Sequence, residues 1–386
     1  MPPRNTTPTY NGGLSQTANA MVLQTNNDLT MSYRKQINSW LESTTGLGGT
    51  MQYDRQNTMV AKAQQLGSFG ETVNNGTATV TENRSERSIM GGYLQETIGL
   101  FDKLYLTGAA RLDASSVYGV DNRWQFYPKV SGSYLLSEED FWRDSKLSDI
   151  IPSVKIRAAW GESGNLTAIG AYDRYTLYNP VNYSGVIGYI SSAQLGNTTI
   201  QPERQREFEV GTDISMFKDR LSIEFSYYNK DIKDMILNRT LAPSTSFNNR
   251  FQNVGVMTNK GIELMVKGVP VQSKDFTWIT TVGYTHNKNV INGVEGNGIL
   301  PFAGGFGQVA AVNGYPLGAF YSTFYARNAD GSLLLTAGGL PQRERGTQGP
   351  NGTYTAQRDA NGQPSGTILS KVIGDPNPKH IVSSDQ

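Results

Sequence analysis

Several stretches of the chain alternate between apolar and polar side chains over about ten residues. In one stretch, Leu221, Ile223, Phe225 and Tyr227 interleave with Ser222, Glu224, Ser226 and Tyr228. Residues 154–160, 207–216 and 276–285 follow the same pattern. Successive side chains of a β-strand point to opposite faces, so each stretch predicts a strand with one apolar and one polar face. About ten residues suffice for a tilted strand to cross a bilayer, which predicts a wall between lipid and water.

The composition is compatible with such a wall. Hydrophobic residues make up 37% of the chain, and the mean hydropathy is −0.43. Half of every barrel strand is polar, so a low hydropathy does not exclude a membrane barrel. The 34 Lys and Arg residues nearly balance 33 Asp and Glu residues, which gives no indication of nucleic-acid binding. Cysteine is absent, which excludes disulfides and thiolate zinc sites.

Short and long connections alternate between the predicted strands. Short connections are expected at residues 101–104, 217–220 and 269–275. Long segments rich in Gly, Asn, Ser, Thr and Tyr are expected to be loops at residues 67–87, 164–201, 235–260 and 292–318. Short turns at one end and long loops at the other are typical of outer-membrane barrels. A serine before acidic residues predicts a short helix or turn within residues 136–142.

The predicted fold is all-β, an antiparallel meander that forms part of a transmembrane β-barrel. We count about ten to twelve strands, about half of a 22-stranded transporter barrel. The first residues are polar and lack the apolar segment of a secretion signal, and the last residues resemble the start of another strand. We therefore expect a piece of a longer protein, with an open, curved sheet or a strained closure and with residues 1–26 poorly ordered.

The order of several motifs resembles one protein family. The motifs lie at residues 91–116 (beginning GGY), 123–131 (RWQFYPKVS), 154–165 (ending WGESGN), 202–234, 253–264 (NVGVMTNKGIEL) and 374–379 (GDPNPK). In this order they resemble the SusC/RagA group of TonB-dependent outer-membrane transporters of Bacteroidota. The resemblance extends from about residue 90 to about residue 380.

The resemblance implies that residues 1–386 are a partial TonB-dependent receptor β-barrel domain, without the family's plug domain and signal peptide. It implies outer-membrane uptake of an oligosaccharide or peptide, as in polysaccharide utilisation. The implied partners are outer-membrane lipids, a SusD-like surface lipoprotein, the TonB–ExbB–ExbD complex acting through the plug region, and the glycan or peptide substrate. Nucleic acid is not an expected partner.

Three other interpretations of the chain remain open at this point. The chain could form a passive porin or adhesin-type barrel, or it could be a non-functional truncated gene product. It could also be a soluble β-rich binding protein, in which a second sheet would have to cover the apolar strand faces.

Charged residues on the polar strand faces are the first group of candidate site residues. They are expected to face the barrel lumen, and they are Arg111, Asp113, Arg157, Glu207, Glu209, Asp213, Glu224 and Glu263, with Lys155 and Lys267 in the same pattern. Their role is either contact with a plug or solute, or ion pairing between strands in a wet interior.

Tyrosines in the segment 164–201 are the second group, and they are Tyr172, Tyr175, Tyr178, Tyr183 and Tyr189. Aromatic rings can stack on sugars or peptide side chains, so these tyrosines are candidate ligand-binding residues. The alternative is that they pack the loop against its neighbours or a lipoprotein lid. Further aromatic residues near strand ends predict an interfacial girdle, namely Trp124, Phe126, Tyr127, Trp160 and Trp278.

The sequence gives no support for catalysis, and we do not expect an enzyme. The two histidines, His286 and His380, are far apart in sequence, and no thiol is available. The segment 161–164 lacks the spacing of a hydrolase nucleophile turn. We therefore expect no catalytic residue, no cofactor and no metal site.

Overall fold

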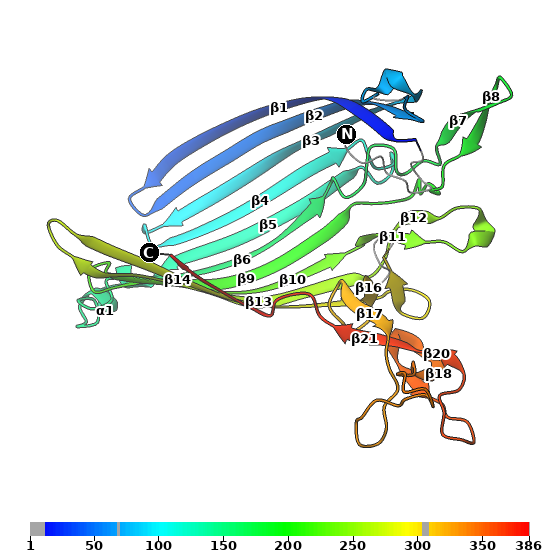
Figure 1. The fold of residues 1–386 in the computed structure, drawn as a ribbon. Helices are drawn as coiled ribbons and strands as arrows, with labels where there is room; N and C mark the ends of the chain where they lie inside the picture. The colour runs from blue at the N-terminus through cyan, green and yellow to red at the C-terminus, as the bar shows by residue number, and fades with distance from the viewer. Residues whose placement is uncertain (1–11, 68–69, 303–308, 386) are drawn as a thin grey trace.

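The structure is a computed structural model that describes residues 12–67, 70–302 and 309–385. It is dominated by an antiparallel sheet of eleven strands in the order β1-β2-β3-β4-β5-β6-β9-β10-β13-β14-β22 (Figure 1). The bounds of these strands are Leu14–Asn38, Leu41–Gln64, Thr77–Leu100, Leu104–Ser115, Trp124–Leu135, Ser153–Asn165, Glu203–Met216, Leu221–Lys233, Val256–Gln272, Thr277–Asn292 and His380–Asp385. The all-β meander expected from the sequence is confirmed.

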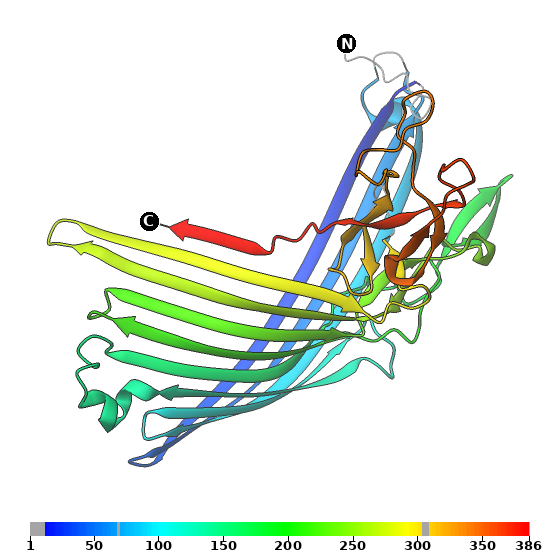
Figure 2. The same ribbon diagram turned by 90° about the horizontal axis from the view of Figure 1, so that it is seen from below.

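The sheet is strongly curved and open (Figure 2). Strands β1 and β22 form its two edges and do not pair with each other in the part of the chain that the structure describes. Of the two expected forms, an open, curved sheet and a strained closure, the structure has the open sheet. No helix among the described residues is long and apolar enough to cross a membrane.

Short turns occupy one end of the sheet. The turn between β3 and β4 places Phe101 and Asp102 at positive φ, and the turn between β9 and β10 does the same at residues 217–219. The predicted short helix is confirmed as a 3-10 turn, Leu136–Glu138, followed by α1, Asp140–Arg143. This helix lies at the short-turn end, and the long loops lie at the opposite end (Figure 1).

The loop end carries its own small sheets. Strands β7 (Tyr178–Tyr183) and β8 (Val186–Ser191) form one hairpin, and β11 (Ile236–Thr240) and β12 (Asn249–Asn253) form another. Between β14 and β22 the chain builds two further sheets. Their strands are β15 (Ile299–Pro301), β16 (Val309–Val312), β17 (Ala319–Thr323), β21 (Ser370–Gly374), β18 (Arg345–Gln348), β19 (Tyr354–Ala356) and β20 (Thr367–Ile368). Short 3-10 turns lie at Val73–Asn75, Pro243–Thr245 and Pro350–Gly352.

Several expectations about loops are wrong, including those for residues 256–260 and 269–272, which belong to β13. Residues 14–26 are not disordered, because they belong to β1 and pair with β2 along its length, while residues 1–11 lie outside the described residues. Residues 77–87 are not a loop, because β3 begins at Thr77 and pairs with β2 from there. The backbone groups of these polar segments form a regular ladder, which does not require an apolar side-chain pattern.

The strand register gives the sheet two distinct faces. Phe225 lies opposite Thr212 of β9 and Leu264 of β13, and Leu264 lies opposite Tyr284 of β14. We call this side the apolar face; it includes Leu106, Leu112, Val130, Ile156, Phe208, Ile223, Phe225, Ile262, Leu264, Trp278 and Val282. The predicted alternation of β6, β9, β10 and β14 is thereby confirmed.

The aromatic girdle is only partly as expected. Trp124, Phe126, Trp160 and Trp278 lie on the apolar face. Tyr127 does not, because it pairs with Arg111 on the opposite side of the sheet, where it is only 5% exposed. Pro128 and Phe126 hold the apolar positions on either side, so the local alternation leaves Tyr127 with the polar residues.

Glu96 is an exception on the apolar face, where it lies between Leu94 and Ile98 of β3. Its carboxylate accepts hydrogen bonds of 2.5 Å from the hydroxyls of Ser43 and Thr45 on β2. These two hydroxyls supply the donors that hydrocarbon cannot offer.

Gly261 of β13 is a position where the sheet tolerates no side chain. A Cβ there would lie 2.4 Å from the backbone oxygen of His286 and 2.5 Å from the hydroxyl of Tyr228. We therefore expect Gly261→Ala to lower the free energy of unfolding in detergent by about 1–3 kcal/mol, the usual cost of overpacking. Gly108 of β4 is the control, because its Cβ would meet nothing within 4 Å. Equal unfolding midpoints for Gly261→Ala and Gly108→Ala would contradict this.

The charged face and the candidate ligand-binding loops

The opposite side of the sheet, which we call the charged face, brings together the charged residues expected from the sequence. These are Arg111 and Asp113 on β4, Arg157 on β6, Glu207, Glu209 and Asp213 on β9, Glu224 on β10 and Glu263 on β13. Their side chains share one face because each follows the alternation of its strand in continuous register.

Arg157 is the centre of the largest network on this face. Its guanidinium pairs with Glu209 and, at 3.3 Å, with Asp213, and it donates a 2.5 Å hydrogen bond to the hydroxyl of Ser226. Lys155 lies 3.4 Å from the second oxygen of Asp213. Gly211 leaves room for this arrangement, because a Cβ there would lie 2.8 Å from the guanidinium carbon of Arg157. The network therefore joins three adjacent strands, β6, β9 and β10.

A second network joins β4 to β2 across the intervening strand β3. The guanidinium of Arg111 lies 2.7 Å from the carboxylate of Asp113 and donates a 3.1 Å hydrogen bond to the hydroxyl of Thr50. The absent side chain of Gly91 makes room for Asp113, because a Cβ there would overlap the carboxylate.

The other charged residues on this face are outside these two networks. The carboxylate of Glu207 lies 3.7 Å from the ammonium group of Lys230. Glu224 and Glu263 make no salt bridge within the described residues.

The five candidate tyrosines fall into three groups rather than one cluster. Tyr172 and Tyr175 lie at the base of the loop, where the guanidinium of Arg174 sits 4.5 Å from the ring centre of Tyr175. Tyr178 and Tyr189 share one face of the β7–β8 hairpin, with Pro180 opposite Tyr189. Tyr183 lies on the other face of the hairpin, opposite Val186.

A buried cluster lies at the base of the loop, although Tyr172 and Tyr175 are themselves 41% and 42% exposed, and the hairpin tyrosines are more exposed still. Tyr118 is fully buried with Val117, Ile169 and Ile200, and its hydroxyl donates a 2.8 Å hydrogen bond to the carbonyl of Asn165. Burial is the main reason why the pKa of Tyr118 is raised well above its usual value. By contrast, Tyr178, Tyr183 and Tyr189 are 66%, 82% and 73% exposed.

The hairpin lies in a segment without charge. No residue between Arg174 and Glu203 is charged. Both faces of the hairpin carry apolar side chains, with Tyr178, Tyr189 and Ile187 on one face and Tyr183 and Val181 on the other. Two isolated strands are only marginally stable in water, so contacts with other molecules would stabilise them.

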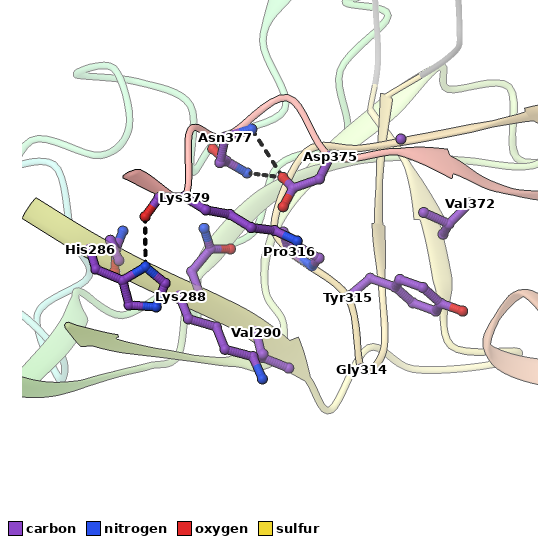
Figure 3. Close-up of a pocket in the computed structure, with 13 residues that line it drawn as sticks. His286, Lys288, Val290, Gly314, Tyr315, Pro316, Val372, Asp375, Asn377 and Lys379 are labelled. Carbon is purple, nitrogen blue, oxygen red and sulfur yellow. Dashed lines mark hydrogen bonds between the residues drawn. The ribbon is translucent and has the colours of Figure 1, made fainter. Parts of the chain in front are cut away.

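Sequence reasoning missed a third site, a pocket of about 430 Å³ beside β14 (Figure 3). Its lining includes His286 and Lys288 of β14, Tyr315, Asp375 and Lys379. The sequence suggested that His286 and His380 are far apart, but the pairing of β14 with β22 stacks their rings with centres 4.7 Å apart. No group of three potential metal ligands of the His, Cys, Asp or Glu type occurs among the described residues.

The observed architecture defines a class of protein. An antiparallel wall with one apolar face, one charged face, short turns at one end and long loops at the other is an outer-membrane β-barrel wall. A family described as "TonB dependent receptor-like, beta-barrel" matches residues 3–367. The chain belongs to this family, whose members are outer-membrane barrels.

Individual relatives agree with this assignment. The chain is 28% identical over 330 residues to TonB-dependent receptor P3 of Formosa agariphila, covering 78% of this chain and 32% of that protein. It is 25% identical to TonB-dependent receptor SusC of Bacteroides thetaiotaomicron, covering 51% of this chain and 20% of SusC. The chain thus spans about a third or less of the length of these relatives.

A solved structure shows the same fold. The RagAB peptide transporter matches with a TM-score of 0.75 at 20% identity, covering 99% of this chain and 41% of that chain. The resemblance to the SusC/RagA group and the partial-barrel fold are therefore confirmed.

Proposed function

We propose that this chain is part of the barrel wall of a TonB-dependent transporter that takes up an oligosaccharide or a peptide across the outer membrane of a bacterium of the Bacteroidota. The observation that carries the proposal is that one wall combines two features. Its charged face has ion pairs between neighbouring strands, and its loop end has an uncharged hairpin with exposed tyrosines. On this proposal residues 1–386 belong to the barrel domain, and a plug elsewhere in the transporter closes the lumen.

The charged face is proposed to line the water-filled lumen. Ion pairs such as that between Arg157 and Asp213 are stable there because water and opposite charges solvate both groups. Glu224 and Glu263 are the candidates for contact with a plug or a passing solute, since neither makes a salt bridge within the described part of the chain. The TonB–ExbB–ExbD complex would act through that plug.

The hairpin is proposed to contact the substrate or a SusD-like lipoprotein above the barrel. Tyr178 and Tyr189 offer two exposed rings on one face of β7–β8. Rings of this kind stack on sugars or on peptide side chains, and the phenol adds a hydrogen bond. The lack of charge between Arg174 and Glu203 favours a ligand surface that is itself uncharged.

Energy dependence distinguishes this proposal from a passive porin. The gene would be deleted in its host and restored with the intact gene, and uptake of labelled oligosaccharides and peptides would be measured with and without TonB. We expect uptake to require both the gene and TonB. Uptake that needs the gene but persists without TonB would favour a porin, and uptake unaffected by the deletion would contradict both.

We predict that the double change Tyr178→Ser and Tyr189→Ser weakens binding of the recognised oligosaccharide or peptide roughly tenfold. Each aromatic contact contributes about 0.5–1.5 kcal/mol beyond its buried area. Titration calorimetry on the purified protein measures the change. The matched control is Tyr183→Ser with Val186→Ser, which removes an exposed pair from the other face of the same hairpin. A greater loss of affinity in the control than in the Tyr178 and Tyr189 variant would show that the ligand contacts the other face of the hairpin.

A further inference from the structure

The apolar face changes character where β13 and β14 approach the loop end. Its residues on β13 run Val266, Leu264, Ile262 and then Lys260, and those on β14 run Val282, Tyr284, His286 and then Lys288. A lysine therefore lies just beyond the apolar run on the apolar face of each strand, directly after it on β13 and one position further, after His286, on β14.

These two lysines are direct neighbours, because Lys260 pairs with Lys288 in the register of β13 and β14. The Cβ atoms of such pairs lie about 4.5–5.5 Å apart, and like charges in this position repel each other. Neither ammonium group makes a salt bridge within the described part of the chain. An anion bound between them would remove the repulsion.

A third lysine and two histidines extend this basic group. Lys379 precedes β22 and lines the same pocket as Lys288 and His286 (Figure 3). The carbonyl of Lys379 lies 2.8 Å from Nδ1 of His286, and the hydroxyl of Tyr284 lies 2.9 Å from Nδ1 of His380. These contacts engage Nδ1 of both rings and leave the two Nε2 atoms for other partners.

Two carboxylates lie nearby, and both have other partners. Asp375 accepts 3.0 Å hydrogen bonds from the backbone and side-chain amides of Asn377. Asp231 of β10 accepts a 2.8 Å hydrogen bond from the hydroxyl of Thr258 and lies diagonal to Lys260 in the register. Neither carboxylate forms an ion pair with the three lysines in the described residues.

We infer that Lys260, Lys288 and Lys379, with His286 beside them, bind the phosphate groups of an anionic glycolipid in the outer leaflet. The position of Lys260 and Lys288 favours a lipid over a soluble anion, because the apolar residues Ile262, Leu264 and Val282 lie directly below these two lysines for the acyl chains. An amphiphile satisfies both halves of this surface, since ammonium groups pair with phosphate and the apolar row packs against hydrocarbon. The inference concerns the outside of the wall and is independent of the transported substrate.

The test uses the full chain in zwitterionic detergent, with lipid A as the probe. Native mass spectrometry would compare lipid A with its dephosphorylated form and with inorganic phosphate. We expect the change of Lys260, Lys288 and Lys379 to glutamine to weaken lipid A binding at least tenfold, because each lysine adds to the attraction for the anionic headgroup. Removing the phosphates should have a similar effect, and arginine at the three positions should preserve binding.

The matched control removes the same charge from the opposite end of the sheet. Lys146, Lys218 and Lys274 lie in the connections at the short-turn end, and their change to glutamine should leave lipid A binding unchanged. Equal binding by the chain and the first triple variant, or an equal loss in the control variant, would overturn the inference. Inorganic phosphate that competes for the three lysines would assign the site to a soluble anion and not to a lipid.

Discussion

The substitution Phe225→Arg is expected to lower the free energy of unfolding of the membrane-inserted chain by about 2–4 kcal/mol, because this is the cost of an arginine on the lipid face near the bilayer midplane. Phe225 lies in β10 between Ile223 and Tyr227, opposite Thr212 and Leu264, and is 38% exposed. No carboxylate lies directly across from it on either neighbouring strand. Urea unfolding in lipid vesicles, followed by tryptophan fluorescence, measures the loss.

Glu224→Arg is the control for this prediction. Glu224 is the residue before Phe225 on the same strand but lies on the charged face, opposite Asp213. A cation is solvated on that face, so we expect a change within about 1 kcal/mol. If Glu224→Arg proves more costly than Phe225→Arg, the two faces have been assigned the wrong way round.

The substitution Arg157→Met is expected to produce the second-largest effect and to lower the free energy of unfolding by about 1–3 kcal/mol. Arg157 joins Glu209, Asp213 and Ser226, and its removal leaves Glu209 without its salt-bridge partner and leaves Asp213 with Lys155 alone. Breaking a buried ion pair costs about 3–5 kcal/mol, and this network is about a third exposed, which lowers the cost. The measurement is again the unfolding midpoint in detergent or vesicles.

A second variant separates lost charge pairing from lost packing. Glu209→Gln should recover part of the stability in the Arg157→Met background, because Glu209 has no other salt-bridge partner among the described residues. Lys129→Met is the matched control, since Lys129 lies on the charged face and makes no salt bridge within the described residues. Additive effects of Arg157→Met and Glu209→Gln would show that the two residues do not interact.

Much of the sheet follows from local sequence. The alternation along residues 221–228 alone separates Phe225 from Glu224, and it does so because a strand has a side-chain period of two. Where such runs follow one another across short turns, the register is set by the turns, as at residues 217–219. The eight charged residues therefore share a face as expected, although their contact with plug or solute is still a prediction.

Other features depend on distant segments and could not be predicted. The pairing of His286 with His380 joins β14 to β22 across the long excursion through β15–β21. No local pattern specifies which strand closes such a long connection. Residues 77–87 are polar but form a strand, because their backbone pairs with β2 regardless of side-chain pattern. The aromatic ring of Tyr127 predicts a position facing lipid, whereas the alternation of β5 leaves Tyr127 beside Arg111 on the charged face.

The central claim is that one face of this sheet contacts lipid and the other contacts water. The chain contains no cysteine, so single cysteines at residues 222–227 of β10 can carry a fluorescent label without a background signal. Quenching by a water-soluble agent and by brominated lipid would be compared at each position. We predict that labels at 223, 225 and 227 respond to the lipid quencher and labels at 222, 224 and 226 to the aqueous one. The same response at all six positions, or the reversed alternation, would contradict a barrel wall.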